Sequence, residues 1–70
     1  SSDPIKDKLY QAIVKDNTLN YAAYAAVIGV SEATVKRRLG ELKKAGLITR
    51  VGSNKNGHWE IVGKEGEYYE

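Results

Sequence analysis

Basic side chains gather in one stretch of this 70-residue sequence, and they are the residues best suited to a defined chemistry, the binding of a polyanion. Residues 31–58 hold seven basic residues and two acidic ones, a local charge of +5. Residues 1–30 hold three of each sign, and residues 59–70 hold one basic residue and four acidic ones. The seven basic residues are Lys36, Arg37, Arg38, Lys43, Lys44, Arg50 and Lys55. The local electric field of a segment matters more than the net charge of the chain for binding a polyanion, so residues 31–58 are a candidate nucleic-acid interface. For any one lysine, the alternative is that it only forms part of a solvated surface.

Other kinds of site find little support in the sequence. His58 is the only histidine, and no serine or carboxylate pair around it indicates a catalytic triad. No glycine-rich phosphate loop precedes a helix, and the absence of cysteine removes thiolate zinc sites and disulfides. We therefore expect no enzyme activity, no cofactor, no metal and no small-molecule substrate. No run of 18 apolar residues is present, so we expect no membrane span.

Three helices are predicted to carry the basic stretch and its support. Residues 1–17 predict the first helix, with Asp3 as its N-cap and Asn17 as its end. Residues 20–29 predict a second helix that begins after an asparagine cap and ends at a glycine. Residues 31–46 predict a third helix, capped by Ser31 and ended by a second glycine. Its apolar stripe of Val35, Leu39 and Leu42 points to a core beneath it.

A β-hairpin is predicted to follow the helices. Residues 47–51 are rich in β-branched side chains, and residues 58–62 alternate, with Trp59 and Ile61 on one face. Residues 53–57 between them form a polar turn that contains Asn-Gly. Because a lone hairpin is marginal in water, Trp59, Ile61, Ile48 and Leu47 must pack it on the helices. We expect residues 1–62 to form one domain and residues 63–70 to be a loosely ordered tail.

The spacing Ala25-x-x-x-Gly29-x-Ser31-x-x-Thr34-Val35-x-x-x-Leu39 predicts two helices that meet at a steep angle. A small residue at Ala25 allows close approach, Gly29 supplies the turn, and Val35 anchors the third helix on the second. This pattern resembles a helix-turn-helix. Leu42-x-x-Ala45-Gly46-Leu47-Ile48-x-Arg50 resembles the passage from recognition helix into wing in winged bacterial regulators.

Val51-Gly52-Ser53-x-Lys55-x-Gly57-His58-Trp59-Glu60-Ile61 is similar to the C-terminal winged domain of bacterial RecG-like ATP-dependent helicases or predicted transcriptional regulators. The resemblance covers residues 5–62. It implies an α+β winged helix-turn-helix, with three helices followed by a two-stranded wing. It also implies a cytoplasmic bacterial module of a larger regulator or helicase-like protein, with double-stranded DNA as its partner.

A helix-turn-helix places the start of its recognition helix at the base edges of the major groove. Lys36 and Arg37 can then donate to guanine, Ala33 can contact a thymine methyl group, and Glu32 can either accept from cytosine or balance the helix dipole. Arg38 lies nearer the inward edge, so a structural ion pair and a phosphate contact are both open. Lys43 and Lys44 suit the negative end of the helix. The predicted DNA-binding residues are Ser31, Glu32, Ala33, Thr34, Lys36, Arg37, Arg38, Arg50, Asn54, Lys55 and Asn56.

The second helix is apolar nearly all round, because Ala22, Ala23 and Ala26 occupy the face where relatives usually carry acidic residues. Alanine at these positions can simply favour the helix. The alternative is a surface for a second copy of the chain or for other domains of a parent protein. The competing hypothesis for function is therefore a winged helix used for protein interaction or dimerisation, without direct DNA binding.

Overall fold

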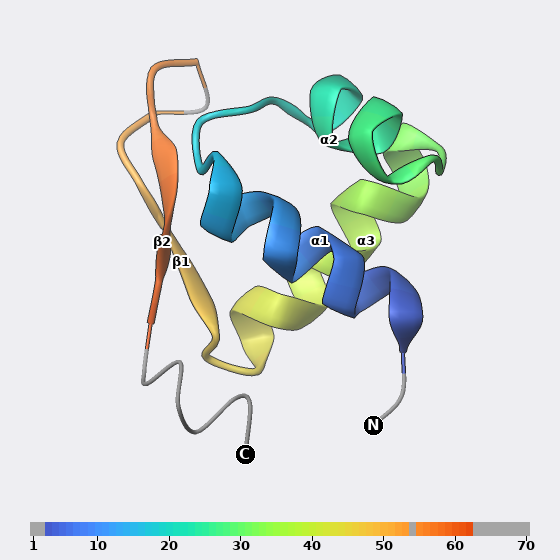
Figure 1. The fold of residues 1–70 in the computed structure, drawn as a ribbon. Coiled ribbons are helices and arrows are strands. Elements are labelled where there is room, and N and C mark those ends of the chain that lie inside the picture. The colour runs from blue at the N-terminus through green and yellow to red at the C-terminus, as the bar shows by residue number, and fades with distance from the viewer. Residues whose placement is uncertain (1–2, 54, 63–70) are drawn as a thin grey trace.

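The computed structural model describes residues 3–53 and 55–62, and within them three helices precede a two-stranded sheet (Figure 1). The elements are α1 (Pro4–Lys15), α2 (Tyr21–Ile28), α3 (Glu32–Lys44), β1 (Ile48–Val51) and β2 (His58–Ile61). This order confirms the predicted α+β winged helix-turn-helix. The predicted tail at residues 63–70 lies outside the described residues.

The helix ends follow the predicted capping residues. Asp3 accepts from the amides of Ile5 and Lys6 at the start of α1, and Asn20 accepts from the Ala23 amide at the start of α2. Gly29 ends α2 in the left-handed region, with a φ of 76°. After α3, Gly46 has a φ of 82°, a conformation that glycine adopts without the penalty of a Cβ atom.

Helix α1 ends two residues before the predicted boundary of residue 17. Asp16 leaves the helix in an extended conformation, with φ −152° and ψ 103°. Its carboxylate then accepts from the Thr18 amide at 3.0 Å and from the Thr18 hydroxyl at 2.6 Å. These two hydrogen bonds lower the pKa of the Asp16 carboxyl group. They also stabilise a local turn, which competes with a further turn of the helix.

The core lies where the three helices and the sheet meet. Helices α1 and α3 bury Leu9, Ile13, Val35, Leu39 and Leu42 in it. Tyr24 of α2 is fully buried, and its hydroxyl donates to the Asp16 carbonyl at 2.6 Å. Burial raises the pKa of Tyr24 above its usual range. The apolar stripe predicted for the third helix is confirmed as its buried face.

The wing packs on the helices through both of its strands, β1 against α3 and β2 against α1. The strands are antiparallel, with Ile48 opposite Ile61 and Arg50 opposite Trp59. Trp59 and Ile48 are buried in the core, and Leu47 and Ile61 pack against it, as predicted. Asn17 adds a link that the sequence did not reveal: its side-chain amide donates to the Trp59 carbonyl at 2.6 Å, and its carbonyl accepts from the Trp59 amide at 2.9 Å. Asn17 therefore borders β2 as a third strand would.

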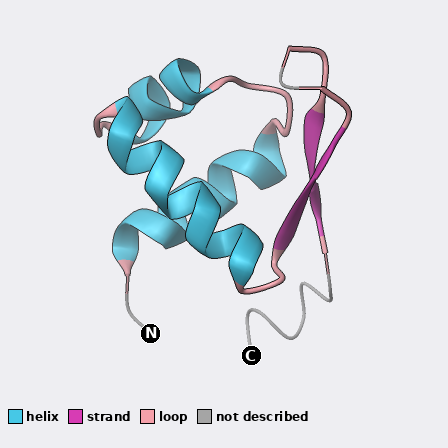
Figure 2. Ribbon diagram, turned by 180° about the vertical axis from the view of Figure 1, so that it is seen from behind, coloured by secondary structure: helices cyan, strands magenta, loops and turns pink. Residues whose placement is uncertain are grey.

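Helix α3 and the wing share one side of the molecule. In Figure 2, α3 crosses in front of α1, and the two strands stand beside it. The face of α3 opposite its buried stripe is therefore open toward the side where the wing also lies. No helix in the described part of the chain is long and apolar enough to cross a membrane.

Candidate nucleic-acid interface

The N-terminus of α3 is fixed by its cap. The Ser31 hydroxyl accepts from the Thr34 amide at 3.1 Å and donates to the Thr34 hydroxyl at 3.0 Å. Ser31 is exposed and Thr34 is half-buried, so both predicted site residues serve the helix start itself. Glu32 and Ala33 follow on the exposed first turn, where a helix favours negative charge.

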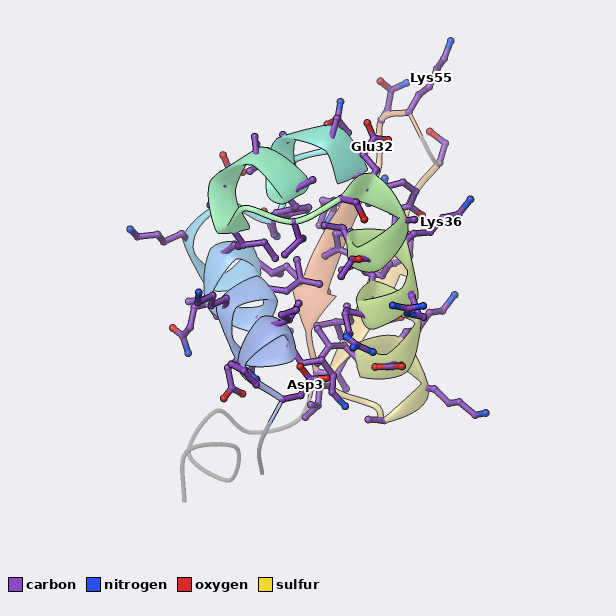
Figure 3. All side chains as sticks on the ribbon, turned by 90° about the vertical axis from the view of Figure 1, so that its right-hand side faces the viewer. Asp3, Glu32, Lys36 and Lys55 are labelled. Carbon is purple, nitrogen blue, oxygen red and sulfur yellow. The ribbon has the colours of Figure 1, made fainter. Side chains whose placement is uncertain are left out.

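The outer face of α3 is the side turned away from Val35, Leu39 and Leu42. Lys36 and Arg37 are exposed on this face, one turn after Glu32 and Ala33. The Lys36 ammonium lies 6.0 Å from the centre of the Tyr21 ring, so α2 supports its direction. Figure 3 shows Glu32 at the start of α3 and Lys36 projecting away from α1. These residues form a polar face that can approach the edges of bases.

Arg38 lies apart from this face. Its guanidinium pairs with Asp3 at 3.4 Å and with Glu41 at 3.1 Å, and Lys6 approaches Glu41 at 3.9 Å. Asp3 stands at the start of α1, at the far end of α3 from Glu32 (Figure 3). Of the two alternatives left open by the sequence, the structure shows the ion pair between α1 and α3. Contact of Arg38 with DNA stays an untested prediction.

Arg50 is also engaged within the protein. Its guanidinium lies 5.2 Å from the centre of the Trp59 ring and donates to the Ser53 carbonyl at 3.0 Å. Because the Trp59 amide donates to Asn17, Arg50 and Trp59 form a non-hydrogen-bonded pair of the sheet, in which facing side chains lie closest. Arg50 therefore braces the wing, a role that the sequence did not predict.

The tip of the wing is a compact turn built around Ser53. Its hydroxyl accepts from the Asn56 amide at 2.9 Å, and its carbonyl accepts from the Gly57 amide at 2.8 Å. Lys55 and Asn56 are exposed at this tip, and Figure 3 shows Lys55 projecting from it. Asn54, another predicted site residue, lies outside the described residues. The turn can thus present a lysine and polar groups to a groove or a phosphate.

A second surface lies between α1 and α2. A groove there is lined by both polar and apolar side chains, and Val14 and Val27 are 43% and 63% exposed. Residues 3–53 and 55–62 contain no group of three or more histidine or acidic side chains that could hold a metal ion. Among the described residues, the outer face of α3 with the wing and the α1–α2 groove are therefore two candidate surfaces for a partner.

Comparison with known families agrees with this geometry. The family model described as winged helix-turn-helix DNA-binding matches residues 2–49, which include all three helices and the start of β1. Searches of curated proteins and of solved structures found no match. The match spans well over half of the chain, and the wing completes the fold beyond it. The chain belongs to the winged helix-turn-helix DNA-binding family.

Proposed function

We propose that this chain binds double-stranded DNA with the outer face of α3 in the major groove and the wing tip on the neighbouring backbone. The observation that carries the proposal is the shared exposure of Lys36 and Arg37 on the outer face of α3, the helix beside which the two strands of the wing stand (Figure 2). Both side chains can donate to guanine, and an arginine can do so with two parallel bonds. Lys55 at the wing tip adds charge without a fixed geometry for a base.

We further propose that the domain serves a larger cytoplasmic bacterial protein, either a transcriptional regulator or a RecG-like helicase. The resemblance of residues 51–61 to the winged domain of those proteins supports this context. As a single small module it makes few phosphate contacts, so we expect binding in the micromolar range or weaker at physiological salt.

Two variants test the roles within the interface. Arg37→Ala should cost about 1–3 kcal/mol on a preferred duplex and reduce the preference among sequences. Lys55→Ala should weaken all duplexes alike and lower the salt slope of binding by about one. Both side chains are exposed, so both variants should stay folded. The measurement is a salt series for each variant on a selected and on a scrambled duplex. Equal losses on both duplexes for Arg37→Ala would show that Arg37 only contacts the backbone.

Protein docking is the second candidate function, and the exposed Val14 and Val27 in the α1–α2 groove favour it. Chemical-shift mapping separates the two. Duplex DNA at low salt should move resonances of residues 31–40 and 50–57. If DNA moves none of them, and sedimentation at rising protein concentration shows a dimer, the chain is a docking module.

A further inference from the structure

A glycine stands in the middle of α3 where nothing in the described part of the protein requires one. Gly40 is exposed on the outer face, and a Cβ atom built on it meets no atom within 4 Å. Its φ is not positive, unlike that of Gly29, Gly46 and Gly52. Glycine inside a helix lowers stability relative to alanine, because its backbone loses more freedom on folding. Neither conformation nor packing in the free protein explains this residue.

Four basic side chains surround Gly40. Residues three and four positions apart are neighbours on a helix surface, and here these neighbours are Lys36, Arg37, Lys43 and Lys44. All four are exposed, and none is within ion-pair distance of a carboxylate among residues 3–53 and 55–62. The nearest acidic residue in sequence, Glu41, is held toward α1 by Arg38 and Lys6. At Gly40 the backbone of α3 is therefore not covered by a side chain, and four positively charged side chains are its neighbours on the helix surface.

We propose that this Gly40 patch (Gly40, Lys36, Arg37, Lys43 and Lys44) seats a phosphodiester segment of DNA directly against the backbone of α3. The missing side chain sets how closely the helix approaches. Lys43 and Lys44 neutralise the phosphates at that point, and Lys36 and Arg37 border the patch on the side of the bases. Lys43 and Lys44 then contact DNA in addition to favouring the helix end. The proposal rests on the proposed DNA binding. It assigns the first turns of α3 to the bases and the later turns to the backbone.

The test uses a pair of substitutions that add the same side chain at two exposed helical positions. Gly40→Gln adds bulk inside the patch, and Ala26→Gln adds it on α2, which carries none of the proposed contacts. Gly40→Ala adds only one methyl group. Affinity for a duplex is measured as a function of salt, and thermal unfolding is measured for every variant.

Stability and affinity should move in opposite directions. Both Gly40 variants should unfold at a higher temperature than the unsubstituted chain, by about 4–8 °C for Gly40→Ala. At about 0.1 M salt, Gly40→Gln should bind roughly tenfold more weakly and lose about one unit of salt slope, the equivalent of one phosphate contact. Gly40→Ala should lose less affinity than Gly40→Gln. Ala26→Gln should bind as the unsubstituted chain does.

Two failures can be told apart. In the first, the unsubstituted chain, Ala26→Gln and Gly40→Gln all bind DNA equally well. The DNA backbone then does not approach Gly40, so this inference is wrong while the proposed function stands. If the unsubstituted chain binds no duplex even at low salt, the proposed function fails and the inference fails with it. A loss of affinity in Gly40→Gln without any change in salt slope would also overturn the inference, because the lost contact would not involve phosphate.

Discussion

Asn17 links the helices to the wing, and its replacement by alanine should destabilise the whole domain. Asn17→Ala removes the amide that donates to the Trp59 carbonyl at 2.6 Å, but it keeps the backbone bond from the Trp59 amide. A hydrogen bond contributes about 0.5–1.5 kcal/mol net, and a buried acceptor left without a partner costs about 1–3 kcal/mol. Since Asn17 is only half-buried, water can reach part of the site. We therefore expect the free energy of unfolding to fall by about 1–2 kcal/mol, the lower part of the cost of an unpaired buried acceptor.

The chain contains one tryptophan, Trp59, so its fluorescence reports directly on this contact. The unfolding temperature should fall by about 4–8 °C for each kcal/mol lost. Thr18→Ala is the control, because it removes a bond to Asp16 on the exposed side of the same turn and should change stability by less than about 0.5 kcal/mol. Asn17→Asp places a carboxylate oxygen against the Trp59 carbonyl and should be less stable than Asn17→Ala at neutral pH. If Asn17→Ala and the unsubstituted chain unfold at the same temperature, the hydrogen bond from Asn17 to Trp59 does not stabilise the wing.

Two further predictions concern the turn of the wing and the buried tyrosine. Gly57→Ala should destabilise the domain by about 2–4 kcal/mol in denaturant unfolding, since its Cβ would overlap the carbonyl oxygens of Ser53 and Val51. Tyr24→Phe should cost about 0.5–1.5 kcal/mol at neutral pH by removing the bond to Asp16. Because burial raises the pKa of Tyr24 in the folded chain, its contribution to stability is complete below the unfolded value of about 10 and is lost as the pH rises through the folded value. Denaturation between neutral pH and pH 11 should therefore show a smaller alkaline loss in Tyr24→Phe.

The sequence predicted the elements that depend on local signals. The caps at Asp3, Asn20 and Ser31 and the glycines after α2 and α3 act within a few residues, so the residue types themselves reveal them. The apolar stripe of α3 was equally readable, because its period depends only on the helix. These signals were enough to predict the fold class and the outer face of α3.

The contacts that the sequence did not reveal join residues far apart in the chain. Asn17 and Trp59 are separated by 42 positions, and nothing in either residue type indicates the other as its partner. Arg50 is a basic residue in a wing, so local chemistry favoured DNA, whereas the fold places its guanidinium over Trp59. For Arg38 the sequence left both an ion pair and a phosphate contact open, because the ion pair depends on Asp3 at the start of another helix. Local sequence shows which residues carry charge, but tertiary packing decides which charges remain available.

The number of exposed basic residues limits how strongly one copy of the domain can bind DNA. Of the seven basic residues in the segment 31–58, Arg38 and Arg50 contact other groups of the protein, and the other five are exposed. If each of the five neutralised one phosphate, the salt slope of binding would reach about 4.5, about half of that known for a tight repressor. We therefore expect one copy to bind a duplex more weakly than such a repressor does. The exposed groove between α1 and α2 lies on elements that carry none of the five cations, so a partner docked there would leave all five free to contact DNA.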